Sequence, residues 1–584
     1  MTSFRHAHWE LTEVDERDVL RLSRDLDVPA PVARILLARG ISDVSHAAEF
    51  LDPSLDRHLH DPLAMLGMDR AVERLRRAVA DGERIRIVSD YDVDGTTASV
   101  ILQHTFRLLG AGDRVSYHIP SRFDEGYGFS VAAAEQAASD GAGVIVTCDI
   151  GVRDHAAVNR ASDLGIDVVI CDHHLPPGED VPSRALAVLC PKQNNCEYPN
   201  DYLAACGLSL KVAQAMLSDH PRRDDVIASL VKLAAIGTVA DMVELDDLEN
   251  RAIVSAGLAG LSQPSRNHGL AALLEVSGLG GKPVSASDCG YKLGPRINAA
   301  GRLAAATTVI ELFNATSAES AMEIARELNR LNGERQEVQQ RLVEHVMNEM
   351  EALGEVPTVA LFAGDEADGW HRGVVGIVAS KVVDALNRPA FIVAVDADGV
   401  GRGSARSANG IHLVDALESA SDLLVKFGGH RAAAGFTVHR DHLESLRDRL
   451  SEFVSAKVGS DGDLSPRYRA DASMSPDEVT LDAARELLRL EPHGIGNPRP
   501  MFLVESATVR RVLIMKERHL KLVLAGDVAG SVEAVWWDGA EFARECPIGS
   551  RIDVLASCSV NEWQGVARPQ LVIKDARPAQ NPER

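Results

Sequence analysis

The feature that most constrains the fold is a short run from Ile85 to Gly95, with the sequence IRIVSDYDVDG. It opens with apolar, β-branched residues and ends in Asp90, Asp92 and Asp94. Acids at alternate positions project from one face of an extended chain, and the glycine permits a turn into a helix. Three carboxylates at the end of a buried strand repel one another unless a cation neutralises them. The run therefore predicts a metal site at a strand end, although alone it also fits an acidic turn.

Three later segments repeat this pattern. Residues 84 to about 241 alternate strand-like and helical runs, which is typical of a doubly wound parallel sheet. Ligands of such sheets bind beyond the C-terminal ends of the strands. We interpret three further apolar runs as segments that deliver polar residues to that edge: VIVTC before Asp149, VVIC before Asp172-His173-His174, and LAAIGTVA before Asp241. Acids gathered at four such ends predict one site.

The residue types indicate the chemistry. Carboxylates with imidazole suit Mn²⁺ or Mg²⁺, and the histidine favours Mn²⁺. No thiolate belongs to the set, so a structural zinc is not expected. The set exceeds what one ion takes but fits two ions about 3.5–4 Å apart, as in two-metal phosphoryl transfer. Asp149 is the predicted bridging ligand. The predicted metal ligands are Asp90, Asp92, Asp94, Asp149, His173 and Asp241, with His174 contacting an ion or the phosphate.

A second α/β unit is expected after a long linking helix, Ala318 to about Leu353. It starts near Val356 and holds three glycine-rich segments, 371–376, 401–407 and 428–430, whose backbone N–H groups and polar side chains suit an anion. The loop 294–302 adds Arg296 and Arg302, and arginine offers bidentate donors to phosphate. The alternatives are glycine-rich turns in the second unit and a helix-capping loop with two solvated arginines.

The two ends of the chain differ in character. Residues 1 to about 80 look helical, and a packing or docking arm is the default interpretation. Residues 465 to 484 are polar and are expected to connect the second α/β unit to the C-terminal segment. From about 501 to 575, short strands with glycine turns predict a small barrel. Lys521 and Trp563 there suit tracking and stacking of a single strand.

Composition sets the outer limits. A chain of 584 residues should form several domains, and 45% hydrophobic with 25% charged residues is ordinary for globular protein. We expect no membrane span. Eight cysteines without a CxxC pair favour a reducing cytoplasm. The net charge of −24 argues mildly against a nucleic-acid partner, but a basic groove can exist inside an acidic protein.

The motifs together resemble a known family. DYDVDG, TCDIG, DHH and AIGTVAD, in this order, are similar to the four motifs of the DHH phosphoesterase superfamily. IPSRFDEGYG, GPRINAAGRL, WHRGVVGIVAS, GSARS, FGGHRAAAG, PHGIGNP and NEWQG narrow the resemblance, over about residues 20 to 575, to its RecJ-like exonucleases. One departure from the wider superfamily is Val88, where many members have a metal-binding histidine. Asp90 is the expected substitute.

The resemblance implies an organisation and an activity. The expected fold is α/β: an N-terminal helical arm (1–80), a DHH parallel-sheet metal domain with a helical connector (81–315), a linker helix (316–355), a DHHA1 substrate-binding domain (356–464), and a connector with an OB-like barrel (465–584). The implied enzyme hydrolyses single-stranded DNA from the 5′ end to mononucleotides in repair and recombination, with two divalent cations. A helicase and a single-strand-binding protein would supply substrate, and a cytoplasmic monomer is expected.

The resemblance also implies residue roles. Arg122, Arg296, Ser404 and Arg406 would surround the 5′ phosphate, and His371 and His430 would lie near the scissile phosphate. Asp149, His173 and His174 complete the expected catalytic set. Further substrate contacts are expected from Tyr127, Asn298, Arg302, Arg402, Gly429, Lys521 and Trp563.

Two other functions remain open from the sequence. One is a small-substrate phosphodiesterase, acting on nanoRNA or a cyclic dinucleotide, or a pyrophosphatase. Such relatives usually lack a segment like the one after residue 465. The other is a non-catalytic replication scaffold, whose relatives usually lose the metal acids that this chain keeps. Removing residues after 465 should separate the first alternative from a strand-tracking nuclease.

Overall fold

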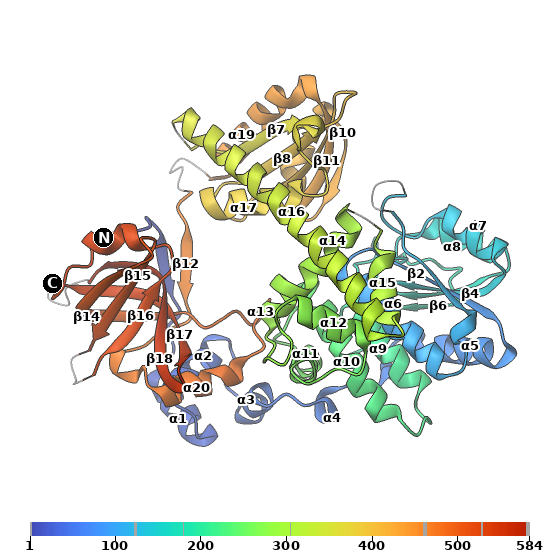
Figure 1. Ribbon diagram of the computed structural model, residues 1–584, viewed down its shortest axis with the longest axis horizontal. Coiled ribbons are helices and arrows are strands. Elements are labelled where there is room, and N and C mark those ends of the chain that lie inside the picture. The colour runs from blue at the N-terminus through green and yellow to red at the C-terminus, as the bar shows by residue number, and fades with distance from the viewer. Residues whose placement is uncertain are drawn as a thin grey trace.

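The computed structural model (Figure 1) describes residues 3–121, 125–178, 180–303, 305–354, 356–458, 464–526 and 530–579, without the side chains of Arg302 and Leu303. The described residues form two α/β bodies and a β-barrel, and one long helix joins the α/β bodies. Among these residues, no helix is long and apolar enough to cross a membrane. All eight cysteines are free thiols.

The first body is a parallel sheet in the order β3-β2-β4-β5-β6. Its strands are β2 (Arg84–Ser89), β3 (Val115–His118), β4 (Ala142–Cys148), β5 (Asp167–Cys171) and β6 (Ala187–Leu189). Side chains alternate between its faces, so one face packs on α7 (Val131–Ser139) and α8 (His155–Asp163). The other packs on α5 (Met68–Asp81), α6 (Val93–Leu108) and α9 (Ala205–Met216). The predicted doubly wound sheet is confirmed.

One predicted strand is wrong. The apolar run before Asp241 is the end of helix α10 (Arg223–Ala240), which packs between α6, α9 and α11 (Leu248–Leu261). A short apolar run fits a buried helix as well as a buried strand. Close packing explains Gly237, because a Cβ there would lie 2.6 Å from the hydroxyl of Thr97. Asp241 therefore reaches the sheet edge from a helix C-terminus.

The helices of the connector are α12 (His268–Val276), α13 (Ala286–Asp288), the π-helix η3 (Cys289–Leu293), α14 (Gly294–Leu303) and α15 (Thr307–Asn314). The segment 294–302, expected as a loop, is thus a helix. Its glycines serve close approach, since a Cβ on Gly301 would lie 3.1 Å from the carbonyl oxygen of Tyr91.

Helix α16 (Ala318–Leu353) confirms the predicted linker. Its 36 residues make it about 54 Å long. Ala321, Ala325 and Leu328 in its first half belong to the core of the first body. Leu342 and Val346 in its second half belong to a core of the second body. One rigid element therefore sets the spacing of the two bodies.

The second body has the sheet order β10-β11-β9-β8-β7. Its strands are β7 (Ala360–Asp365), β8 (Ala390–Val395), β9 (Val400–Arg406), β10 (Leu424–Gly429) and β11 (Ala433–His439). Its helices are α17 (Val375–Leu386), α18 (Leu413–Glu418) and α19 (Leu443–Val458). The segment 401–407, expected as a loop, is mostly strand β9. Its Gly403 lies beneath the ring of Phe436, which leaves no space for a Cβ.

The C-terminal barrel has the order β13-β14-β15-β16-β18-β17 and closes through pairing of β14 with β17. Its strands are β13 (Ala472–Ser473), β14 (Phe502–Met515), β15 (His519–Ala525), β16 (Val532–Trp536), β17 (Arg551–Trp563) and β18 (Val566–Pro578). The barrel prediction is confirmed, with β14, β17 and β18 extending well beyond the predicted short strands.

The N-terminal segment shares the core of this barrel. Helices α1 (Glu16–Leu26), α2 (Ala30–Ala38) and α3 (Val44–Leu51) pack with α20 (Leu481–Glu486) and the barrel strands in one apolar cluster, and α4 (Leu55–His58) follows. Strand β1 (His8–Leu11) pairs in parallel with β12 (Arg467–Ala470). The two ends of the chain therefore fold together.

A buried arginine ties these parts to the first body. Arg251, on α11, is fully buried. Its guanidinium lies 3.6 Å from the ring centroid of Phe50 and donates to five backbone carbonyls, those of Phe50, Leu245, Leu490, Glu491 and Pro492. Burial lowers the pKa of Arg251 to about 9. One side chain thus joins the arm, the metal domain and the segment that leads into the barrel.

We predict that Arg251→Met lowers the free energy of unfolding by about 3 kcal/mol or more, because each buried carbonyl left without a donor costs about 1–3 kcal/mol. Urea unfolding followed by circular dichroism measures the change. The control is Arg24→Met, whose side chain is 76% exposed. Equal midpoints for the two variants would contradict the assigned role.

Candidate active site

The predicted ligands follow the ends of β2, β4, β5 and α10, and they meet at one edge of the first sheet. Asp90 follows β2, and Asp92 caps α6 by accepting from the backbone N–H of Gly95 at 3.0 Å. Asp94 is buried and accepts from the first backbone N–H groups of α9, those of Ala205 at 2.7 Å and Cys206 at 2.8 Å. The helix dipole of α9 favours a negative charge at that point.

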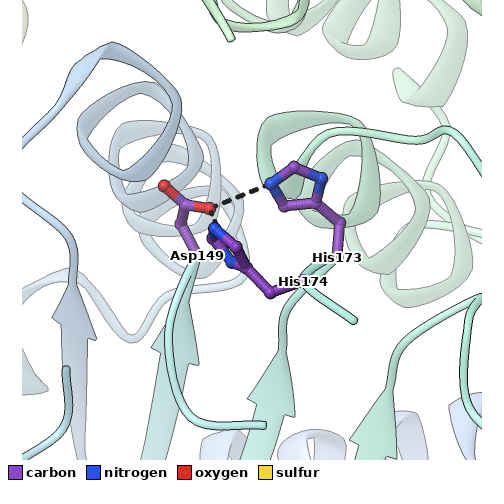
Figure 2. Close-up of side chains that lie close together, drawn as sticks. All are labelled: Asp149, His173 and His174. Atoms are coloured by element: carbon purple, nitrogen blue, oxygen red, sulfur yellow. Dashed lines mark ion pairs between the residues drawn. The ribbon is translucent and has the colours of Figure 1, made fainter. Parts of the chain in front are cut away.

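Figure 2 shows His173 and His174 directed toward Asp149, which follows β4. The Nε2 atom of His173 lies 3.2 Å from Asp149 Oδ1 and 3.4 Å from Asp241 Oδ2. His174 Nδ1 lies 3.7 Å from the same Asp149 oxygen. Three overlapping groups have ligand atoms within 4.8 Å of one another: Asp90 with Asp92 and Asp149, Asp149 with both histidines, and Asp94 with His173 and Asp241. Asp149 and His173 each belong to two of these groups, and of the two only the carboxylate has two oxygens to offer to two ions.

Burial and mutual repulsion shift the pKa values of these groups. Burial, then Asp92 and Asp94, raises the pKa of Asp149 well above its usual range. Burial, then Asp94, raises the pKa of Asp241 to about 9. Burial lowers the pKa of His173 to about 4, which keeps its ring neutral and able to ligate. These acids are unfavourable together as a bare cluster.

Divalent cations fit this donor set. Asp149 Oδ1 and both ring nitrogens of His173 are buried and lack a hydrogen-bond partner among the described residues. Buried polar atoms without partners are rare in native structures and call for an unseen ligand or ion. The donors are carboxylate oxygens and imidazole nitrogens, which suit Mn²⁺ or Mg²⁺.

Asp172 is one of the acids that the sequence places at this edge of the sheet, but the sequence pattern predicts no specific role for it. Its Oδ1 lies 2.8 Å from Nδ1 of His174 and accepts from the His174 backbone N–H, while Oδ2 accepts from the backbone N–H of Val152. Burial alone would raise the pKa of Asp172, but these hydrogen bonds and the charge of His174 bring it below its usual range. Asp172 therefore orients His174. An acid directly before two histidines at a strand end was the available signal.

A cavity of about 840 Å³ lies between the two α/β bodies. Tyr91 and Tyr127 line it from the first body. The Tyr127 hydroxyl donates to the backbone carbonyl of Asp149 at 3.2 Å, so the cavity reaches the ligand cluster. The second body contributes Arg372, Arg402, Arg406 and Lys426, against Glu125 as the acid in the lining. The cavity is thus cationic within an acidic chain.

One corner of this cavity is built for an anion. Ser404 and Arg406 lie on β9 beside the N-terminus of α17, and the Arg406 guanidinium donates to the Ser404 hydroxyl at 3.1 Å. A Cβ on Gly376 would lie 3.0 Å from that hydroxyl and 3.2 Å from Arg406 Nη2. Glycine therefore lets both side chains approach the helix N-terminus, where backbone N–H groups and the dipole favour phosphate.

Other predicted substrate residues lie elsewhere or outside the described residues. Arg296 bonds Asn329 and the Lys292 carbonyl on the surface of α14, where Asn298 is half-buried. His371 accepts from the backbone N–H of Gly373, and His430 follows Gly429 at the end of β10. Gly373 lines the cavity, whereas His371, Gly429 and His430 are not in the lining that the structure describes. Lys521 pairs with Glu533 on the barrel, and Trp563 is 73% exposed. Arg122 and the side chain of Arg302 lie outside the described residues.

The fold and the site define a class of protein. Family models match the DHH family N-terminal domain at residues 84–238, the DHHA1 domain at 355–456 and the RecJ OB domain at 470–575. The chain is therefore a DHH-type phosphoesterase with an added OB domain.

Individual relatives narrow the class. A single-stranded-DNA-specific exonuclease RecJ of Dickeya dadantii is 34% identical, over 97% of this chain and 99% of the relative. The Bacillus subtilis protein of the same name is 35% identical, over 97% and 70%. A crystal structure of RecJ in complex with Mn²⁺ from Thermus thermophilus covers 98% of this chain and 80% of that chain, with a TM-score of 0.81 at 28% identity. The chain belongs to the RecJ family.

We predict that Asp149→Asn stabilises the metal-free protein, because it removes a buried group that repels its neighbours when ionised. The thermal midpoint in EDTA should rise by about 2 °C or more, since 1 kcal/mol corresponds to about 2–4 °C. Mn²⁺ should raise the midpoint of the wild type but not of the variant.

The matched control for this measurement is Asp219→Asn, whose side chain is 93% exposed. It should leave both midpoints unchanged. A full Mn²⁺ response in Asp149→Asn would contradict the assignment of Asp149 as a ligand.

Proposed function

We propose that this chain is a metal-dependent exonuclease that hydrolyses single-stranded DNA from the 5′ end and releases mononucleotides. One observation carries the proposal: a cationic cavity with a phosphate corner meets a cluster of metal-type ligands through Tyr127. The relatives' names supply the substrate class. The net charge of −24 does not oppose it, because basic side chains outnumber acidic ones in the described lining where the strand end would bind.

The residues that would hold two cations are Asp90, Asp92, Asp94, Asp149, His173 and Asp241, with Asp149 between them. The chemistry that such a pair supplies when bound is activation of water and stabilisation of the leaving oxygen. RecJ structures are described in complex with Mn²⁺ and with Mg²⁺, which supports either ion here.

The chain's own side chains would position the substrate. Ser404 and Arg406, with the N-terminus of α17, would bind the terminal 5′ phosphate, and Arg402 would contact the backbone beside it. His174, oriented by Asp172, would contact the scissile phosphate. His371 and His430, which are not in the cavity lining that the structure describes, would lie near the scissile phosphate when a strand is bound. Arg122 and Arg296 would add to the contacts around the 5′ phosphate, and Asn298, Arg302 and Gly429 would add contacts to the strand.

The setting of the activity is also part of the proposal. Exposed Trp563 and Lys521, on different strands of the barrel, would hold the strand outside the cavity. A helicase and a single-strand-binding protein would supply substrate. We propose a cytoplasmic monomer, in keeping with eight free cysteines.

The decisive experiment uses 5′-phosphorylated single strands labelled at either end, with Mn²⁺ or Mg²⁺, beside duplex DNA and RNA. We expect stepwise release of mononucleotides from the 5′ end and none from Asp149→Ala. Turnover of dinucleotides without cleavage of long strands would instead assign the protein to the small-substrate phosphodiesterases.

The anion-binding corner formed by Ser404, Arg406 and the N-terminus of α17 leads to a second prediction. Arg406→Ala should raise KM about tenfold or more for 5′-phosphorylated strands, because a hydrogen bond to a charged group is worth about 1.5–3 kcal/mol. Strands with a 5′ hydroxyl should be affected far less. The control is Arg431→Ala, an exposed arginine of the same domain outside the cavity lining. An equal effect on both kinds of strand would place Arg406 away from the terminal phosphate.

A further inference from the structure

A second cavity, of about 530 Å³, adjoins the ligand cluster. Ala240 and Met242, the residues on either side of Asp241, both line it. Tyr91 and Tyr127, by contrast, flank the cluster within the cationic cavity of the cleft. One cavity therefore has chain neighbours of Asp90 and Asp92 in its lining and the other has chain neighbours of Asp241, and the proposed function uses only the first.

The walls of the second cavity present unusually exposed apolar groups. Tyr291 is 81% exposed, Met242 is 66% exposed and Ile495 is 42% exposed. Met242 has φ +60°, a left-handed conformation that costs a non-glycine residue free energy. Tyr291 lies in the π-helix η3, and π-helical turns recur at functional sites. A strained methionine directly after the predicted ligand Asp241 and an exposed tyrosine ring in the same cavity indicate a binding surface.

This surface is held rigidly. Asp288 forms a capping box with Ser285 and pairs with Lys292 at 2.7 Å, which fixes the turn on which Tyr291 lies. On the other wall, the carbonyl of Ile495 accepts from the backbone N–H of Leu245 at 2.8 Å. An exposed ring on a fixed support loses little entropy when a flat group stacks on it.

The charge of the second cavity's lining suits a nucleobase rather than a phosphate. The lining has one arginine, Arg499, and one glutamate, Glu491, and is otherwise neutral. Burial raises the pKa of Glu491 above its usual value. A nucleobase has a flat apolar face and polar edges, and its stacking on an aromatic ring does not depend on sequence.

The position also fits the course of a strand. Residues 491–499 form one wall and lead directly into β14 of the barrel. In Figure 1, α13 lies on the side of the first body that faces the barrel. A strand whose 5′ end lies in the cationic cavity would cross the acids and leave past Met242 toward the barrel.

We infer that Tyr291, with Met242 and Ile495, forms a nucleobase-stacking subsite for the strand on the 3′ side of the cleaved bond. This inference rests on the proposed function. Tyr291 is a positioning residue, because it would hold the strand in register between the metal ligands and the barrel without touching the reacting atoms.

The test compares Tyr291→Ala with Tyr291→Phe, which keeps the ring, on 5′-phosphorylated strands of 20 nucleotides. Tyr291→Ala should raise KM about tenfold with kcat nearly unchanged, as expected for loss of one base–aromatic stack. Tyr291→Phe should behave as the wild type. Tyr202→Ala, a 48% exposed tyrosine of the same domain outside the cavity lining, is the control and should have no effect.

A scan with one abasic nucleotide at successive positions gives a second readout. The wild type should show a raised KM at one internal position, and Tyr291→Ala should lose this position dependence. Wild-type KM in Tyr291→Ala, an equal defect in Tyr291→Phe, or an unchanged abasic profile would each overturn the subsite. If the wild type degrades no strand at all, the proposed function fails, and the subsite fails with it. The two failures are thus distinguishable.

Discussion

Repulsion among buried carboxylates determines how the first body must be built around its predicted metal ligands. Asp94 and Asp149 lie almost without solvent contact, and burial raises the pKa of each. A cluster that disfavours its own ionised form needs a scaffold that does not relax away from it. Two backbone N–H groups of α9 hold Asp94, and a Cβ at Gly95 would lie 2.6 Å from the carbonyl oxygen of Asp90. The site is therefore preorganised at a cost that cation binding would offset.

Most of the ligand cluster at the sheet edge is predictable from sequence, because several of its acids directly follow the strands that position them. β-Branched runs that end at Asp90, Asp149 and Asp172 carry both the strand signal and the ligands. Asp241 was predicted for the site but from the wrong element, because an apolar run with small residues fits a buried helix equally well. Its proximity to His173 is set by packing of α10 on α6 and α9, which no local pattern encodes.

The glycine-rich motifs were harder to interpret, because their glycines serve tertiary contacts rather than turns. Gly301 makes room for the backbone of Tyr91, Gly403 for the ring of Phe436 and Gly376 for Ser404 and Arg406. Each partner lies far away in sequence or on another element. Anion binding in this region stays a prediction. The sequence pattern favours loops for Ser404 and Arg296, whereas the structure places Ser404 on a strand and Arg296 on a helix.

The shared core of the chain ends changes how strand binding can be separated from catalysis. Residues of α1 to α3 pack into the barrel, and Arg251 joins that assembly to the metal domain. Removing residues after 465 would strip the partner from an apolar arm, so loss of activity in such a truncation would reflect misfolding as readily as lost strand contact. Substitutions of exposed side chains leave the shared core intact. Trp563 on the barrel and Tyr291 in the cavity next to Met242 are such positions. Variants at the two positions would separate strand contacts on the barrel from those nearer the metal ligands.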